Sequence, residues 1–173
     1  MKKVVLSIVS IVLLLAMTFG LTACSIMQDY KEVRSNLRDN DYEVETVDGE
    51  DIYYDADYSA LLDVFAYLLE YDVMIEHEDE IDELHPELGK LEKYIDKVIA
   101  AKDEDYESLL FVVYFDDAEY ANEYYELIEP FFQIAKNEGL DHSEFDIAKD
   151  DLVYGKSGSV IYFGTNDALE IAK

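Results

Sequence analysis

The sequence contains one cysteine, two prolines, seven glycines and no tryptophan among its 173 residues. A single cysteine excludes any disulfide within the chain. Basic residues are also scarce, because 13 Lys and Arg stand against 41 Asp and Glu, which gives a formal net charge of −28 at pH 7. Nucleic acids and anionic lipid surfaces are bound through basic patches, so this charge argues against both as binding partners.

Hydrophobic residues make up 50% of the chain, and they include 15 Tyr and 8 Phe. Disordered acidic segments combine high charge with low hydrophobicity, so we expect a folded domain with an acidic surface. The stretch from Cys24 to Lys173 is long enough to bury a hydrophobic core of its own.

The first residues have the three-part pattern of an export signal. Lys2 and Lys3 are positively charged, the stretch from Val4 to Phe19 is largely apolar, and small residues follow from Gly20 onward. A membrane-spanning helix needs about 20 apolar residues, so this stretch is short for a permanent transmembrane segment.

The export signal ends in Leu21, Thr22, Ala23 and Cys24. This tetrapeptide resembles the lipobox of bacterial lipoprotein precursors at all four positions. The resemblance implies cleavage between Ala23 and Cys24 by a lipoprotein-specific signal peptidase and a diacylglyceryl group on the Cys24 sulfur. It predicts a lipid-anchored protein of the cell membrane that faces outside the cytoplasm. The alternative is an ordinary signal peptide that ends in a free cysteine.

These boundaries predict a signal peptide over 1–23, a lipidated tether over 24–28 and a single acidic domain over 29–173. All 41 acidic residues follow Cys24, whereas Lys2 and Lys3 precede it, so cleavage changes the formal charge from −28 to −30.

Hydrophobic periodicity predicts a series of helices and strands in the domain. Alternation in 41–47 and the Asp48-Gly49 pair predict a β-hairpin over 41–54, and no structure is assigned to 72–86. Leu109 to Phe115 is continuously apolar, which is typical of a buried central strand. Helices are predicted over 27–39, 58–71, 87–101, from Asp116 to Gly139 with a kink or restart at Pro130, and over 166–172.

A second hairpin is predicted where 152–154 and 160–163 flank the Gly155–Gly158 turn. Because hairpins supply most strand pairs, we expect an α+β fold, with a mostly antiparallel sheet covered by helices and preceded by an N-terminal signal-peptide helix. The alternative fold is an all-helical bundle with one small sheet.

Short motifs in the last 60 residues are similar to those of uncharacterised acidic lipoproteins of Gram-positive bacteria. They are Tyr114–Ala118, Gly155–Gly158, and Tyr162–Thr165 with Ala168. The resemblance implies no activity.

No motif in the chain predicts catalysis, a cofactor or a metal site. Gly155-Lys156-Ser157 lacks the earlier glycine and the following helix of a phosphate-binding loop, so we expect a hairpin turn there. His77-Glu78 begins like a zinc-protease helix, but Ile81 stands where the second histidine is needed. His85 and His142 are too isolated to complete a zinc site.

Two acidic segments resemble the start of a calcium loop. Asp39-Asn40-Asp41 and Asp55-Ala56-Asp57 both lack the glycine that an EF-hand needs at its sixth position.

Tyrosines form two local groups in the sequence. One contains Tyr53, Tyr54 and Tyr58, and the other contains Tyr120, Tyr124 and Tyr125. We interpret both as residues at the edge of the core, and the alternative is a binding surface for peptide or sugar.

The leading functional hypothesis is a non-enzymatic, lipid-anchored domain that binds an unknown protein partner or contributes to the envelope surface. A second hypothesis is a module that binds calcium, polyamines or cationic peptides through its negative charge. A third is a carboxylate-based hydrolase, because 41 acidic residues leave many pairs open for acid–base chemistry.

Overall fold

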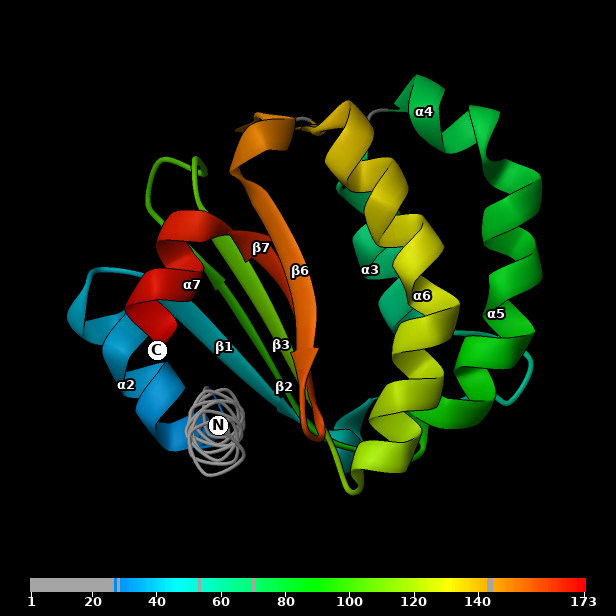
Figure 1. The fold of residues 1–173 in the computed structure, drawn as a ribbon, viewed down its shortest axis with the longest axis horizontal. Coiled ribbons are helices and arrows are strands. Elements are labelled where there is room, and N and C mark those ends of the chain that lie inside the picture. Colours follow the sequence, from blue (N-terminus) through cyan, green and yellow to red (C-terminus); the bar gives the residue numbers. More distant parts are fainter. Residues whose placement is uncertain (1–26, 28, 53, 70, 143–144) are drawn as a thin grey trace, which may run out of the picture.

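A computed structural model describes residue 27 and the ranges 29–52, 54–69, 71–142 and 145–173. Its centre is a five-stranded antiparallel sheet in the order β1-β2-β3-β7-β6 (Figure 1). The strands are β1 (Glu43–Asp48), β2 (Ile95–Lys102), β3 (Leu109–Phe115), β6 (Leu152–Ser157) and β7 (Val160–Thr165). The α+β prediction, with an antiparallel sheet covered by helices, is confirmed. The signal-peptide helix and the boundaries at 23 and 24 lie outside the described residues.

Helices cover both faces of the sheet (Figure 1). One face carries α3 (Ala60–Tyr67), α5 (Glu78–Glu92) and α6 (Ala118–Glu138), and the other carries α2 (Tyr30–Asp39) and α7 (Asn166–Ala172). The short helix α4 (Tyr71–Glu76) joins α3 to α5. The sheet therefore has a hydrophobic core on each side.

Strand β3 explains why a sheet can have two cores. Leu109 and Val113 point into the larger core beneath α3, α5 and α6, whereas Leu110 and Val112 point into the smaller core beneath α2 and α7. Because alternate side chains of a strand face opposite sides, a strand covered on both faces is apolar throughout. The predicted buried central strand is confirmed.

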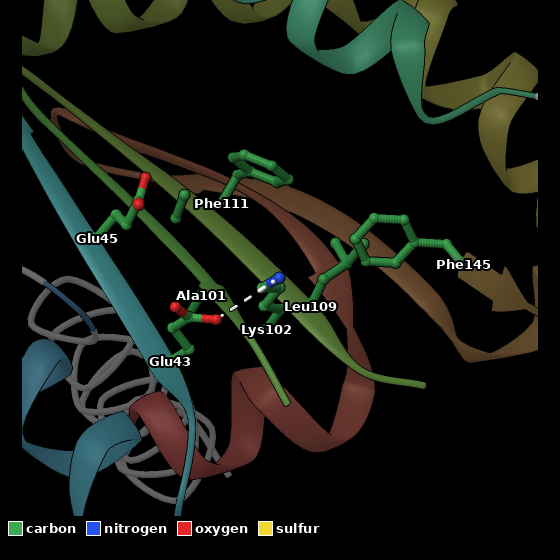
Figure 2. Close-up of a pocket in the computed structure, with 8 residues that line it drawn as sticks. Glu43, Glu45, Ala101, Lys102, Leu109, Phe111 and Phe145 are labelled. Atoms are coloured by element: carbon green, nitrogen blue, oxygen red, sulfur yellow. Dashed lines mark ion pairs between the residues drawn. The ribbon is translucent and has the colours of Figure 1, made fainter. Parts of the chain in front are cut away.

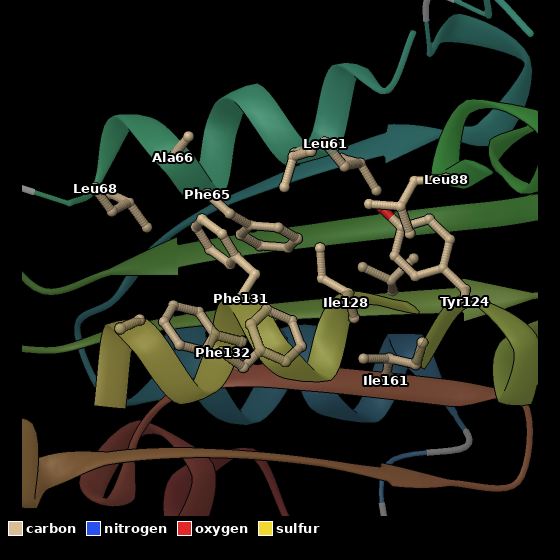
Figure 3. Close-up of a cluster of buried hydrophobic side chains, with 14 of the residues drawn as sticks. Leu61, Phe65, Ala66, Leu68, Leu88, Tyr124, Ile128, Phe131, Phe132 and Ile161 are labelled. Carbon is tan, nitrogen blue, oxygen red and sulfur yellow. The ribbon is translucent and has the colours of Figure 1, made fainter. Parts of the chain in front are cut away.

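Aromatic side chains fill the larger core. Phe65 of α3 meets the rings of Phe111, Phe132 and Phe163 at centroid distances of 5.4, 5.4 and 5.9 Å. Figure 3 shows Phe65 and the α6 residues Phe131 and Phe132 converging over the sheet. These contacts fix α3 and α6 on one face of the main sheet. Loops lie at the two ends of the sheet.

The predicted hairpin over 41–54 is wrong. Strand β1 pairs with β2 over Glu43–Asp48, and residues Gly49–Asp51 form a 3-10 turn. Gly49 does not close a hairpin. A Cβ placed on Gly49 would lie 1.8 Å from the carbonyl oxygen of Ile95, so glycine is required there because two backbone segments meet.

The predicted helix over 87–101 is also wrong, because the chain changes from helix to strand within it. Helix α5 ends at Glu92, and β2 begins at Ile95 with a register shift between Ile95 and Lys97. That irregularity puts Ile95 and Val98 in the same core three residues apart, which imitates a helical period.

The remaining expectations differ from the structure in their boundaries. Helix α6 runs through Pro130 without a restart, and Gly139, at φ +90°, ends it as predicted. Residues Gly155–Ser157 belong to strand β6 rather than to the turn of the C-terminal hairpin, which contains Gly158 at φ +61°. Strands β4 (Leu140–His142) and β5 (Phe145–Ile147) form a small second sheet that was not predicted.

Candidate functional site

A cleft of about 830 Å³ opens at the end of the main sheet where β2 turns into β3. Its walls come from the β2–β3 turn, from the segment after β5 and from the start of α7. We call it the acidic cleft, because six of its lining side chains are carboxylates. They are Asp103, Asp105, Glu107, Asp151, Asp167 and Glu170.

Among the described residues that line the acidic cleft, none is basic. Within the described part of the chain, Glu170 is the one carboxylate of the six with an ion pair, at 2.6 Å from the ammonium of Lys173. Asp103 also has a local partner, because its Oδ1 accepts the backbone N–H of Ser108 at 3.0 Å. Converging carboxylates with few counter-charges produce a negative potential that attracts cations, most strongly at low salt.

The floor of the acidic cleft is a chain of buried hydroxyl groups. Tyr42 donates to the Oγ of Ser108 at 2.7 Å, and that Oγ lies 2.6 Å from the Oγ1 of Thr165. Thr165 also caps α7, since its Oγ1 accepts the N–H of Ala168 at 3.5 Å. Burial raises the pKa of Tyr42, so this floor is neutral and its hydroxyls are occupied with one another.

Tyr106 lines the acidic cleft and contacts Lys102 and Phe145, two residues that line a second, smaller pocket. Its backbone is left-handed, with φ +60°, which is uncommon for an aromatic residue. Its ring meets Phe145 edge to face, with the centroids 5.4 Å apart. The ammonium of Lys102 lies 2.6 Å from the Tyr106 hydroxyl and 3.9 Å from the ring centroid. This hydrogen bond is the main reason that the pKa of Lys102 is raised.

The second pocket, here the edge pocket, holds about 240 Å³ beside the edge strand β1. Glu43 and Glu45 line one side, and the apolar side contains Phe111 and Phe145 (Figure 2). The Glu43 Oε2 lies 3.5 Å from the ammonium of Lys102. An apolar surface beside carboxylates suits a ligand that combines alkyl groups with positive charge.

A serine, a histidine and a carboxylate also meet between α3 and α5, a combination that can support nucleophilic catalysis. The Ser59 hydroxyl donates to Glu92, and the His85 Nδ1 accepts the Ser59 N–H at 3.3 Å. Ser59 is fully buried, however, and its Oγ also accepts the N–H of Leu62 at 3.1 Å. A substrate cannot reach that oxygen in this arrangement, so the cluster joins two helices.

The candidate metal ligands from the sequence lie apart. His77 pairs with Glu80 at 2.9 Å, and His85 stacks on Tyr58 with the ring centroids 4.5 Å apart. The side chain of His142 lies outside the described ones. Among the described residues, no group of three or more His, Cys, Asp or Glu side chains is placed to hold a metal ion.

The two tyrosine groups have different environments. Tyr124 is fully buried in the larger core, with Tyr120 and Tyr125 partly buried around it, in agreement with the core-edge interpretation. Tyr54 and Tyr58 are 46% and 40% exposed, which disagrees with it, and Tyr53 lies outside the described residues.

Sequence reasoning missed both pockets. The acidic turn at 103–105 is visible in the sequence, but the carboxylates opposite it come from more than 40 residues later. The left-handed backbone conformation of Tyr106 gives no signal in the sequence. The lipobox residues Leu21, Thr22, Ala23 and Cys24 lie outside the described part of the chain. Within that part, no helix combines the length and apolarity needed to cross a membrane.

No protein-family model, curated protein sequence or solved structure matches this chain.

Proposed function

We propose that this chain is a lipid-anchored extracytoplasmic binding domain whose acidic cleft takes a ligand with several alkylammonium groups. The observation that carries the proposal is the convergence of six carboxylates on a cleft of about 830 Å³, where Glu170 alone has an ion pair within the described part of the chain. The lipobox at Leu21–Cys24 supports attachment to the cell membrane.

The distribution of the carboxylates favours an extended polycation over a single metal ion. The described residues contain no group of three ligands close enough to bind one ion. The cleft instead spreads its carboxylates over three walls, which suits positive charges separated by methylene groups, as in a polyamine or a lysine-rich peptide. The domain acts in this proposal by binding, without turning over a substrate.

The test is isothermal titration of the full chain, in a nonionic detergent, with spermine in one arm and tetralysine in another. We expect binding that weakens steeply with added NaCl, because screening reduces the attraction. Replacing one carboxylate on each of two opposite walls, in the variant D105N/D167N, should weaken binding about tenfold, which corresponds to about 1.4 kcal/mol.

The matched control is D82N/E83Q, which removes the same charge from exposed positions on α5. If both double variants weaken spermine binding equally, the protein attracts cations by net charge alone and the cleft is not the site. Comparing the affinities for spermine and tetralysine shows whether the cleft prefers a polyamine or a lysine-rich peptide. A calcium titration at matched ionic strength tests the single-ion alternative, which gains support if calcium raises the melting temperature more than sodium does.

A further inference from the structure

One basic side chain, that of Lys102, lines the edge pocket and contacts Tyr106, which lines the acidic cleft. Among the described residues that line the two pockets, Lys102 is the only Lys, Arg or His. Its ammonium contacts three groups: the Tyr106 hydroxyl at 2.6 Å, the face of the Tyr106 ring at 3.9 Å from the centroid, and Glu43 at 3.5 Å. A hydroxyl, a π-face and a carboxylate are the groups that recognise an alkylammonium ion.

These contacts are built into the fold. Glu43 and Lys102 stand directly opposite each other in the β1–β2 register, so the sheet itself places the carboxylate. Tyr106 takes its position through a left-handed backbone at φ +60°, and Phe145 packs against its ring edge to face. The groups around the ammonium are thus held by strand pairing and ring packing that do not depend on the lysine side chain.

The edge pocket continues beyond the ammonium as an apolar surface. Ala100, Leu109, Phe111 and Phe145 line it, and Glu45 adds a second carboxylate on the β1 side (Figure 2). With about 240 Å³ available, the pocket has room for a short alkyl chain. Once the ammonium of Lys102 moves away, the pocket therefore offers an aliphatic amine both partners for its ammonium group and an apolar surface for its methylene groups.

We propose that Tyr106 and Glu43 form a subsite for a terminal ammonium group of the ligand, and that Lys102 occupies this subsite in the free protein as a built-in competitor. The ligand ammonium displaces Lys102, and its methylene groups lie along the apolar side of the edge pocket. The rest of the ligand extends past Tyr106 into the acidic cleft. This inference rests on the proposed function, because it assigns one end of the same ligand.

The test compares variants of Lys102 by titration of the full chain with spermine. K102A removes the competitor, and we expect it to bind spermine at least fivefold more tightly than wild type. The matched control is K90A, which also removes one positive charge, from an exposed pair with Glu87 at 2.7 Å on α5. We expect K90A to change the affinity less than twofold, because screened charge acts weakly over distance.

Two further variants separate displacement from a general charge effect. K102R keeps the positive charge, and a guanidinium also stacks on aromatic rings and pairs with carboxylates, so this variant should bind spermine no more tightly than wild type. Adding Y106F or E43Q to K102A should remove most of the gain, because each deletes one ammonium partner. If K102A fails to fold, as judged by its melting curve, K102Q keeps most of the aliphatic stem and replaces it in the comparison.

The outcomes distinguish the two proposals. If wild type binds spermine and K102A behaves like K90A, Lys102 is a surface ion pair and this inference is wrong while the acidic cleft stands. If neither wild type nor K102A binds, both proposals are wrong. A signal that does not depend on the variants completes the test: the Lys102 ammonium resonance in the NMR spectrum of the wild-type protein should shift toward that of a free lysine when spermine is added. An unchanged resonance at saturation contradicts displacement.

Discussion

The carboxylate of Glu92, the last residue of α5, accepts a hydrogen bond from the hydroxyl of Ser59, the residue that caps α3. The same carboxylate accepts the backbone N–H groups of Ala60 and Leu61, each at 3.0 Å. The first N–H groups of a helix have no partner inside it, and here a buried acid from another helix supplies one. The start of α3 and the packing of α5 therefore depend on each other.

Removing this acid should destabilise the protein strongly. In Glu92→Ala the Ser59 hydroxyl and two backbone N–H groups lose their acceptor inside the protein, so we expect a loss of about 3 kcal/mol in the free energy of unfolding. Glu92→Gln keeps an acceptor oxygen and should lose about 1 kcal/mol. Urea denaturation measures both. The control Glu87→Ala, on the exposed side of the same helix, should change stability by less than about 0.5 kcal/mol. Similar losses for Glu87→Ala and Glu92→Ala would contradict the assigned role.

The same carboxyl group should make stability depend on pH. Burial, the largest cause, raises the pKa of Glu92 above the ordinary value of 4.5, although its hydrogen bonds act in the opposite direction. Just above pH 4.5 the folded state therefore holds more protons at this site than the unfolded state. The contribution of Glu92 is then most favourable below that pH and decreases as the pH rises through the raised pKa.

The measurement is the difference in unfolding free energy between wild type and Glu92→Gln, which cannot titrate at this position. We expect wild type to lose stability relative to Glu92→Gln as the pH rises above 4.5. Taking the difference cancels the repulsion among the other carboxylates, which both proteins share. A difference that stays constant, or that moves in favour of wild type, would show that the pKa is not raised.

Gly89 of α5 should be intolerant of a methyl group. A Cβ at Gly89 would lie 2.6 Å from the carbonyl oxygens of both Asp55 and Tyr58, which are backbone atoms of the loop before α3. In an open helix, Gly→Ala stabilises by about 1 kcal/mol, so the sign of the effect is informative. We expect Gly89→Ala to destabilise by about 2 kcal/mol through overpacking. Thermal unfolding gives the answer, and a stabilised variant would mean that the loop moves away freely.

Replacing Cys24 should abolish lipid attachment. In Cys24→Ala no sulfur is left to carry a diacylglyceryl group, so we expect loss of labelled palmitate and no cleavage between Ala23 and residue 24 in the native host. Two acyl chains hold a protein at a membrane, since each buried methylene contributes about 0.8 kcal/mol. Ser25→Ala serves as the control and should label like wild type. The lipoprotein hypothesis is wrong if Cys24→Ala stays on the membrane and is cut at the same bond.

The parts of the fold that could be predicted from sequence are those whose signals are local. Thr165 caps α7 and Asp117 caps α6, and in both cases the capping side chain and the N–H that it binds lie within three residues. The wrong predictions involve partners that are distant in sequence. Gly49 resembles a turn residue, but the carbonyl of Ile95 determines its role, and no local pattern reveals that contact.

The same reason explains why the candidate site could not be predicted. Its carboxylates form one cleft only when the β2–β3 turn and the start of α7 meet, which brings Asp105 and Asp167 together. In a chain with 41 acidic residues, sequence alone gives no reason to select these. The ammonium subsite depends on Tyr106 adopting a backbone conformation that aromatic residues seldom take.

Helix α2 lies in the chain between the proposed lipid anchor at Cys24 and the acidic cleft. The chain enters α2 at Tyr30 from the side of Cys24, and it leaves the helix just before Tyr42, whose hydroxyl lies in the cleft floor. Ten residues of α-helix span about 15 Å. With a lipid on Cys24, α2 would therefore place Tyr42 and the cleft floor about 15 Å along the helix axis from the end of the helix that follows the anchor in sequence.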